Sequence, residues 1–255
     1  MVNLKNKVVI VTGAGSGIGA AVAKLFLKEK AIVYVVGRKI SRLKNTCEEA
    51  RTLGYLGQSI IQKCDVTIEK DVKKVFKNLK EKSNRLDFLF NNAGIGMKPV
   101  NVSDVNYKDW KKVIDTNING MFLFAKYSYK IMKKQEPKGG RIINNGSISS
   151  FTPRPGSAAY TTSKHAITGL TKSISLDGRK DRVICSQIDI GNAATYLTES
   201  FQKGIIQANG TKLVEPTINV ENVALSVIHI CKMPLNTNVL NTTIMANNMP
   251  FVGRG

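Results

Sequence analysis

The chain has 255 residues, which suits one complete α/β domain, and its 42% hydrophobic and 22% charged residues exclude a largely disordered polypeptide. No apolar run is long enough to cross a bilayer, so no membrane partner is expected. Met1–Val11 passes directly into a glycine-rich turn without a small-residue cleavage site, so it is interpreted as a strand and not as a signal peptide. The sequence therefore predicts a cytoplasmic protein.

The formal net charge of +20 would suit an anionic partner such as nucleic acid. The lysines, however, are scattered along the chain and lack interleaved aromatic residues. Such scattering is typical of solvated helix faces, so no specific nucleic-acid partner is expected. The cysteines (Cys47, Cys64, Cys185 and Cys231) form no Cys-x-x-Cys pair, and there are only two histidines. We expect reduced thiols and no metal site.

Short β-branched runs alternate with longer helical patterns along the chain. The runs that predict strands are Lys7–Val11, Ile32–Val36, Ser59–Lys63, Phe88–Asn91, Arg141–Asn145, Val183–Asp189 and Val239–Ile244. The patterns that predict helices are Gly17–Lys30, Ser41–Leu53, Glu69–Ser83, Asp104–Lys134, Ala158–Leu176 and Val220–Cys231.

The predicted strands lack polar alternation, as a parallel sheet covered on both faces requires. Strand–helix alternation with right-handed crossovers gives a doubly wound α/β fold. We expect about seven strands, helices on both faces, and one domain over residues 1–255. Asn192–Gly210 is the least patterned stretch and is the candidate substrate lid.

A glycine-rich turn, Thr12-Gly13-Ala14-Gly15-Ser16-Gly17-Ile18-Gly19, joins the first strand to the first helix. Gly13 permits a tight turn, Gly17 allows the backbone to approach a pyrophosphate, and Gly19 allows close helix–strand packing. The helix start directs free N–H groups and its positive dipole end at the phosphates. We expect the cofactor phosphates to contact Gly13, Gly15, Ser16, Gly17, Ile18 and Gly19.

Tyr160 and Lys164 lie four residues apart in a predicted helix, so both side chains emerge on one face. A phenol is a poor base at neutral pH, and a neighbouring ammonium group favours its phenolate. The pair is therefore suited to proton transfer. Ser147 ends the fifth strand, where it can donate a hydrogen bond to a substrate oxygen. Ser149 and Ser150 are alternatives if that strand ends elsewhere.

The Thr-Gly-x-x-x-Gly-x-Gly turn together with Tyr-x-x-x-Lys resembles the short-chain dehydrogenase/reductase family. Asn117, Ser147, Tyr160 and Lys164 match the family's catalytic tetrad in order and spacing, and the resemblance extends from about Lys7 to Ile244. It implies a Rossmann-type fold and a homo-oligomer, tetramer or dimer. It also implies that Asn117 distorts its helix and holds a water, and that Tyr160 and Lys164 contact the nicotinamide end of the cofactor.

The resemblance also assigns the remaining cofactor contacts. In the family, an acidic residue usually follows the second strand; here Gly37 and Arg38 stand at this point. Because a guanidinium binds a 2′-phosphate well, this replacement favours NADP(H) as the cofactor. NAD(H) is the alternative. The family pattern places Asp65 beside the adenine. Further contacts are expected from Val66, Asn92, Ala93 and Gly94. Where the family usually has Pro-Gly, this chain has Ile190-Gly191, which predicts a less rigid loop because the proline is missing. Gly191 and Thr195 are still expected at the nicotinamide.

The implied reaction is hydride transfer between NAD(P)(H) and a carbonyl or secondary alcohol, with Tyr160 as general acid/base. The expected substrate is a small molecule, and Asn192–Gly210 with Met97–Val102 is expected to form its pocket. Three alternatives remain open: a catalytically silent NADP-binding regulatory protein, a nucleic-acid-binding protein, and an epimerase or dehydratase of the related extended type. The intact Ser147, Tyr160 and Lys164 argue against the first, and the short C-terminal part argues against the last.

Overall fold

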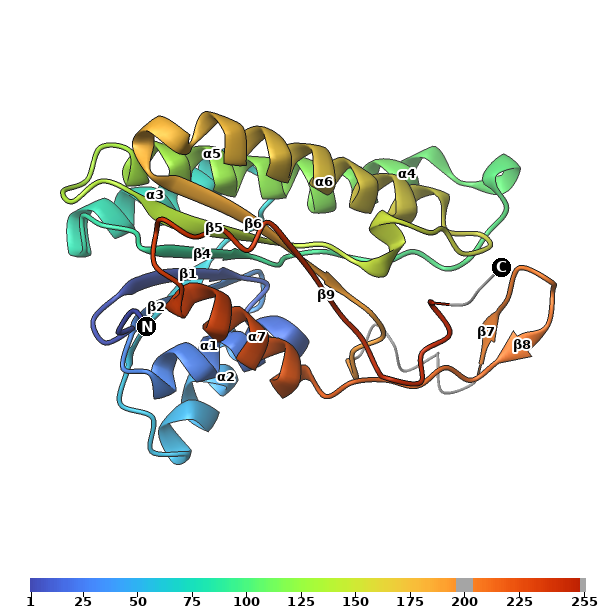
Figure 1. Ribbon diagram of the computed structural model, residues 1–255, viewed down its shortest axis with the longest axis horizontal. Helices are drawn as coiled ribbons and strands as arrows, with labels where there is room; N and C mark the ends of the chain where they lie inside the picture. The colour runs from blue at the N-terminus through green and yellow to red at the C-terminus, as the bar shows by residue number, and fades with distance from the viewer. Residues whose placement is uncertain (196–203, 253–255) are drawn as a thin grey trace.

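Seven parallel strands form the central sheet of the computed structural model, which describes residues 1–195 and 204–252 (Figure 1). The strand order across the sheet is β3-β2-β1-β4-β5-β6-β9. The strands are β1 (Val8–Thr12), β2 (Ile32–Gly37), β3 (Gln58–Lys63), β4 (Phe88–Asn91), β5 (Gly140–Asn145), β6 (Val183–Ile190) and β9 (Asn241–Ile244). The order reverses at β1, and such switch points in doubly wound sheets are where ligands bind.

Helices cover both faces of this sheet (Figure 1). One face carries α1 (Gly17–Lys28), α2 (Ile40–Thr52) and α7 (Val220–Lys232), and the other carries α3 (Glu69–Lys82), α5 (Gly120–Met132) and α6 (Ala158–Asp177). Successive β1 side chains supply both cores: Val9 and Val11 join the cluster under α1 and α7, while Val8 and Ile10 join the cluster under α3 and α5. The predicted doubly wound α/β fold is therefore confirmed.

The predicted helix Asp104–Lys134 is divided in the structure. Asp104 belongs to a short 3-10 turn (Val102–Asp104), and α4 (Tyr107–Ile114) begins after Asn106, whose side chain accepts a hydrogen bond from the Lys108 N–H. A π-helical turn, Asp115–Asn119, then separates α4 from α5. Turns of this kind insert an extra residue into a helix and occur often at functional sites.

The segment predicted to be irregular, Asn192–Gly210, is partly regular. Residues 196–203, which include Tyr196, Leu197 and Phe201 of the predicted pocket, lie outside the described part of the chain. Beyond them, β7 (Ile205–Ile206) and β8 (Lys212–Leu213) form an antiparallel hairpin. Gly210 lies in its turn with a φ of +82°, a conformation that glycine adopts without strain.

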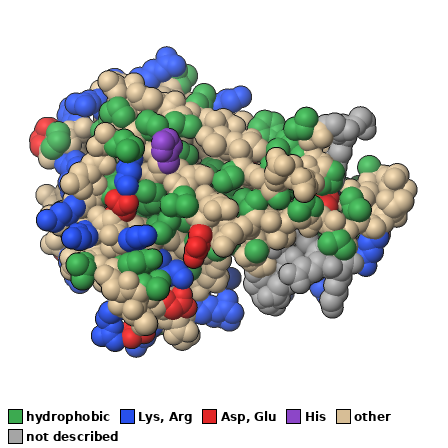
Figure 2. Space-filling model, turned by 60° about the horizontal axis from the view of Figure 1, so that its bottom comes forward, with side chains coloured by type: hydrophobic (Ala, Val, Ile, Leu, Met, Phe, Trp, Pro, Cys, Tyr) green, Lys and Arg blue, Asp and Glu red, His purple; other side chains and the backbone are tan. Residues whose placement is uncertain are grey.

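The positive charge is distributed over the surface. On the face seen in Figure 2, Lys and Arg side chains occupy several separate places, with Asp and Glu between them. Several lysines pair with acids on their own helix, such as Lys73 with Glu69 and Lys77 with Glu81 on α3. This is the arrangement expected for solvated helix faces. Among the described residues, no helix combines the length and apolar character needed to span a bilayer.

Candidate active site

A chain of hydrogen bonds joins the carboxyl ends of β1, β4 and β5. The buried Thr12 hydroxyl accepts hydrogen bonds from the backbone N–H groups of Asn92 (2.8 Å) and Ala93 (2.9 Å). The Asn92 side chain donates to the Thr12 carbonyl and accepts from the Asn145 amide at 2.7 Å. These bonds fix the backbone beside the glycine turn. Thr12 was not among the predicted site residues, because its partners are about 80 residues away along the chain.

The glycine turn is shaped by two residues in the left-handed region, Gly13 (φ +66°) and Gly17 (φ +53°). A Cβ atom on Gly19 would lie 2.3 Å from the Gly13 carbonyl oxygen, so only glycine fits there. Ser16 precedes α1 but makes no side-chain hydrogen bond to the first-turn amides. The turn therefore presents uncapped N–H groups beside a glycine surface, which are features that suit a bound phosphate.

Three of the predicted glycines pack closely against segments that are distant in sequence. A Cβ atom on Gly17 would lie 3.1 Å from Cγ2 of Thr195, so Thr195 is opposite the start of α1. A Cβ on Gly94 would lie 3.3 Å from the Asn117 side chain. A Cβ on Gly191 would lie 2.7 Å from Met245. The structure thus brings Thr195 to the glycine turn, although the two are far apart in sequence.

Lys164 and Tyr160 project from the first turns of α6. The Lys164 ammonium lies 5.5 Å from the centre of the Tyr160 ring. The same Nζ donates a 2.8 Å hydrogen bond to the Asn145 carbonyl oxygen, and Lys164 is 5% exposed. Lys164 is therefore held against the end of β5, with its charge directed towards the partly buried phenol.

Ser147 begins a short 3-10 turn, η3 (Ile148–Ser150), directly after β5. Its hydroxyl oxygen accepts a 3.1 Å hydrogen bond from the Ser149 N–H, which leaves the Ser147 O–H able to donate. Ser150, one of the two sequence alternatives, instead donates its hydroxyl to the Lys164 carbonyl at 3.1 Å. That bond attaches η3 to α6 and so connects the Ser147 segment to the helix that carries Tyr160.

Asn117 lies in the π-helical turn and is fully buried. Its amide donates to the Ile95 carbonyl (3.0 Å) and the Ser163 hydroxyl (3.0 Å), and its oxygen accepts from the Ile95 N–H (2.9 Å). Asn117 therefore attaches the distorted helix to the loop after β4 and to the residue before Lys164. The four residues of the predicted tetrad belong to neighbouring elements at one edge of the sheet.

The residues predicted for the adenosine end lie after β2 and β3. Arg38 is exposed and follows β2. A second exposed arginine, Arg42, lies close to the glycine turn: a Cβ atom built on Gly15 would be 3.1 Å from the Arg42 Cβ. Asp65 follows β3 and accepts hydrogen bonds from the N–H and hydroxyl of Thr67. Val66 is buried against Gly120 of α5. Arg42 was missed in the sequence because its approach to the glycine turn depends on how α2 packs.

A buried ion pair connects two loops near this edge. The Arg154 guanidinium lies 2.6 Å from the Glu215 carboxylate, and Glu215 also accepts from Asn192 (2.9 Å) and Gln207 (3.1 Å). Burial alone would raise the pKa of Glu215, but the Asn192 hydrogen bond and the Arg154 charge together hold it below its usual value. The pair fastens the β7–β8 hairpin to the loop that follows Ser147.

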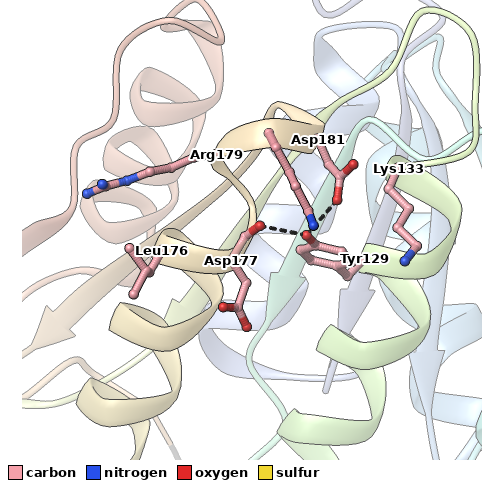
Figure 3. Close-up of a pocket in the computed structure, with 7 residues that line it drawn as sticks. Tyr129, Lys133, Leu176, Asp177, Arg179 and Asp181 are labelled. Atoms are coloured by element: carbon pink, nitrogen blue, oxygen red, sulfur yellow. Dashed lines mark hydrogen bonds between the residues drawn. The ribbon is translucent and has the colours of Figure 1, made fainter.

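A hollow of about 420 Å³ lies at the opposite end of α6, lined by Tyr129, Lys133, Leu176, Asp177, Arg179, Lys180 and Asp181 (Figure 3). At 1.5 Å per residue, Leu176 is roughly 18 Å along the helix from Lys164. The Tyr129 hydroxyl donates to the Asp181 carboxylate at 2.7 Å. Burial, reinforced by that hydrogen bond and by acidic neighbours, raises the pKa of Tyr129 to about 12. This phenol stays protonated and is separate from the Tyr160 site.

Comparison with known proteins decides the family. Residues 7–205 match the family described as short chain dehydrogenase, which is well over half of the chain. The chain belongs to the short-chain dehydrogenase family. The family predicted from the motifs is therefore confirmed, and so is the expected class of enzyme, an oxidoreductase.

This dehydrogenase is 38% identical over 193 residues to a 3beta-hydroxysteroid dehydrogenase of Mediterraneibacter gnavus, covering 76% of this chain and 68% of that protein. It is 36% identical to zerumbone synthase of Zingiber zerumbet, covering 68% of this chain and 64% of that relative. The structure of an archaeal alcohol dehydrogenase from Thermococcus sibiricus, complexed with 5-hydroxy-NADP, has a TM-score of 0.81 at 20% identity, covering 94% of this chain and 97% of the other. That likeness shows the shared fold.

Replacing Glu215 with Gln should destabilise the dehydrogenase in a pH-dependent way. Because the folded-state pKa of Glu215 is lowered, its stabilisation is fully present above the unfolded value of roughly 4.3 and is lost as pH falls through the folded pKa. We expect a loss of about 3 kcal/mol near pH 7, since Arg154 would lose its buried partner.

The measurement is thermal unfolding of both proteins between pH 3 and pH 8, where the difference should shrink towards the acid end. Glu81→Gln is the matched control, because Glu81 is exposed and its pair with Lys77 spans 3.9 Å. A difference that stayed constant across this pH range would contradict the ion-pair account.

Proposed function

We propose that the protein transfers hydride between NADP(H) and a carbonyl or secondary alcohol, with Tyr160 as the general acid/base. The observation that carries this proposal is the placement of Lys164, whose Nζ is bound to the Asn145 carbonyl and faces the Tyr160 ring. The Lys164 charge lies where it would stabilise the negative charge that Tyr160 carries after it gives up its proton to the substrate.

The residues present fit a dinucleotide. The glycine turn with uncapped amides suits the pyrophosphate, with contacts proposed from Gly13, Gly15, Ser16, Gly17, Ile18 and Gly19. Asp65 and Val66 would border the adenine. Asn92, Ala93, Gly94, Gly191 and Thr195, together with Tyr160 and Lys164, would border the ribose and nicotinamide. The bound nicotinamide supplies or accepts the hydride.

NADP(H) is proposed over NAD(H) because of the charge after β2. Gly37 is followed by the exposed Arg38. Arg42, which is on α2, has its Cβ close to Gly15. The guanidinium groups of these two exposed arginines would bind a 2′-phosphate, whereas a carboxylate after β2 would repel it.

In the reducing direction, the Ser147 hydroxyl donates a hydrogen bond to the substrate carbonyl oxygen, which stabilises the negative charge that develops there. Tyr160 transfers its phenolic proton to that oxygen as the carbon gains hydride. Lys164 stabilises the resulting phenolate by its positive charge. Asn117 keeps α5, the loop after β4 and α6 together, and so holds the helix turn that bears Tyr160.

The surroundings of this site are also proposals. A small-molecule substrate would enter beside Met97–Val102, with the segment 192–210 as its lid. We further propose a cytoplasmic homo-oligomer, tetramer or dimer. The oligomer is supported by the family and by Phe122, an apolar side chain that is 48% exposed on α5. The cytoplasm is supported by Cys64, Cys185 and Cys231, which are buried and form no disulfide, as suits a reducing compartment.

Arg38→Ala should weaken NADPH binding while leaving NADH binding almost unchanged, because only NADPH carries the 2′-phosphate. Loss of a charge-assisted contact predicts roughly 10-fold weaker NADPH binding or more. Nicotinamide fluorescence titrations with both cofactors measure this, and Arg179→Ala, a change at the far end of α6, serves as the control.

Tighter binding of NADH than NADPH by the unmodified protein would overturn the NADP(H) preference but leave the enzyme class intact. Binding of neither cofactor would contradict the proposed function as a whole.

Tyr160→Phe should reduce turnover at least about 100-fold, because the variant retains the ring but loses the proton that is transferred. A 3-ketosteroid with NADPH, and a 3β-hydroxysteroid with NADP⁺, are the first probes, chosen from the name of the Mediterraneibacter relative. Tyr129→Phe is the control, since Tyr129 lies in the distant hollow. Undiminished turnover by Tyr160→Phe would rule out the assigned role.

A further inference from the structure

A second buried acidic group lies directly beneath the Ser147 segment. Asp189 is near the end of β6 and is fully buried. Its Oδ1 accepts a 2.8 Å hydrogen bond from the Ser147 backbone N–H. The Gln187 side-chain amide donates to both oxygens, at 2.8 and 3.0 Å, and the Asn241 amide donates to Oδ2 at 2.7 Å. The carboxylate thus joins β6, β9 and the turn after β5.

All of these partners are N–H donors, and none is a cation in the described part of the chain. A carboxylate is the only side-chain group of this size that accepts through both oxygens without presenting a donor. An asparagine here would turn its own NH₂ group towards Gln187 or Asn241, and one of those amides would have to rotate to accept from it. The donors as they are arranged here match a carboxylate.

Gly146, the residue before Ser147, leaves space for the Asp189 carboxylate. A Cβ atom on Gly146 would lie 2.0 Å from Asp189 Oδ1, so any larger residue would displace the carboxylate. The Gly146 N–H donates to the Ile188 carbonyl at 2.8 Å, which continues the β5–β6 pairing. Gly146 and Asp189 are complementary in size, and the contact between them brings the Ser147 amide onto Oδ1.

We propose that Asp189 is a positioning residue for Ser147, because it fixes the Ser147 backbone through a buried carboxylate–amide bond. This inference rests on the proposed function, in which the Ser147 hydroxyl contacts the substrate oxygen. With the backbone held by Asp189, the hydroxyl oxygen is oriented by the Ser149 N–H, and the O–H group remains able to donate. Small displacements of such a donor are costly, since a 1 Å error reduces rates by roughly 100-fold.

The first test is amide hydrogen exchange by NMR on the full chain carrying Asp189→Asn. The Ser147 amide should exchange at least about tenfold faster, because its charged acceptor is replaced. The Gly146 amide, which is bound to the Ile188 carbonyl, and the amides of β1 should not change. Asp177→Asn, an exposed acid beside the distant hollow, is the matched control. Unchanged Ser147 exchange in folded Asp189→Asn would overturn the proposal.

The second test separates positioning from a general loss of structure. With NADPH and a 3-ketosteroid, Asp189→Asn should lower kcat roughly 10- to 100-fold, with the KM for NADPH within about threefold. In a Ser147→Ala background, the same change should have almost no further effect on kcat, because the group it positions is absent. An equal reduction in both backgrounds would show a merely structural role and overturn the inference.

Other outcomes remain informative. If Asp189→Asn does not fold, Asn241→Ala removes one of the donors to the Asp189 carboxylate, from the exposed edge of β9, and should also accelerate exchange of the Ser147 amide. Unchanged exchange contradicts the proposal.

If Ser147→Ala turns over as fast as the unmodified protein, the proposed role of Ser147 fails, and the inference fails with it. If Ser147→Ala is impaired but Asp189→Asn is not, only the inference fails.

Discussion

A continuous path of hydrogen bonds runs across the carboxyl edge of the sheet, from Thr12 through Asn92 and Asn145 to the Lys164 ammonium. Its steps join β1 to β4, β4 to β5, and β5 to α6. Because parallel strands end at the same edge, these groups meet although they are widely separated in sequence. The path ties the glycine turn and the Tyr160–Lys164 pair to one rigid frame, and the two must keep a fixed separation if one molecule is to contact both.

Much of this arrangement could be predicted from local pattern. Buried β-branched runs predict parallel strands, the glycine turn marks where the first helix begins, and helical periodicity places Tyr160 and Lys164 on one face. The family resemblance implies that Asn117 distorts the predicted helix Asp104–Lys134. The pattern of the residues alone does not show the division, because the Asn117 side chain bonds to Ile95 and Ser163, which are far away in sequence. The pairing of Arg154 with Glu215 and the contact between Gly146 and Asp189 are also set by tertiary packing alone.

Several buried polar groups lie where the proposed chemistry takes place. Asp189, Glu215 and Asn117 are each satisfied by several partners, and unsatisfied polar groups in such positions would be strongly destabilising. The β1–β2 side of the molecule, by contrast, is held mainly by apolar contacts under α1 and α7. The fold thus obtains its stability from the apolar layers and its local geometry at the carboxyl edge from hydrogen bonds.

The central claim is that one bound cofactor contacts both the glycine turn and the Tyr160–Lys164 pair. The most direct measurement is a crystal structure of the protein grown with NADP⁺. The account predicts the pyrophosphate on Gly13–Gly19, the 2′-phosphate near Arg38, and the nicotinamide ribose within hydrogen-bond distance of Lys164. A cofactor bound elsewhere, or one whose nicotinamide end points away from Tyr160, would contradict it.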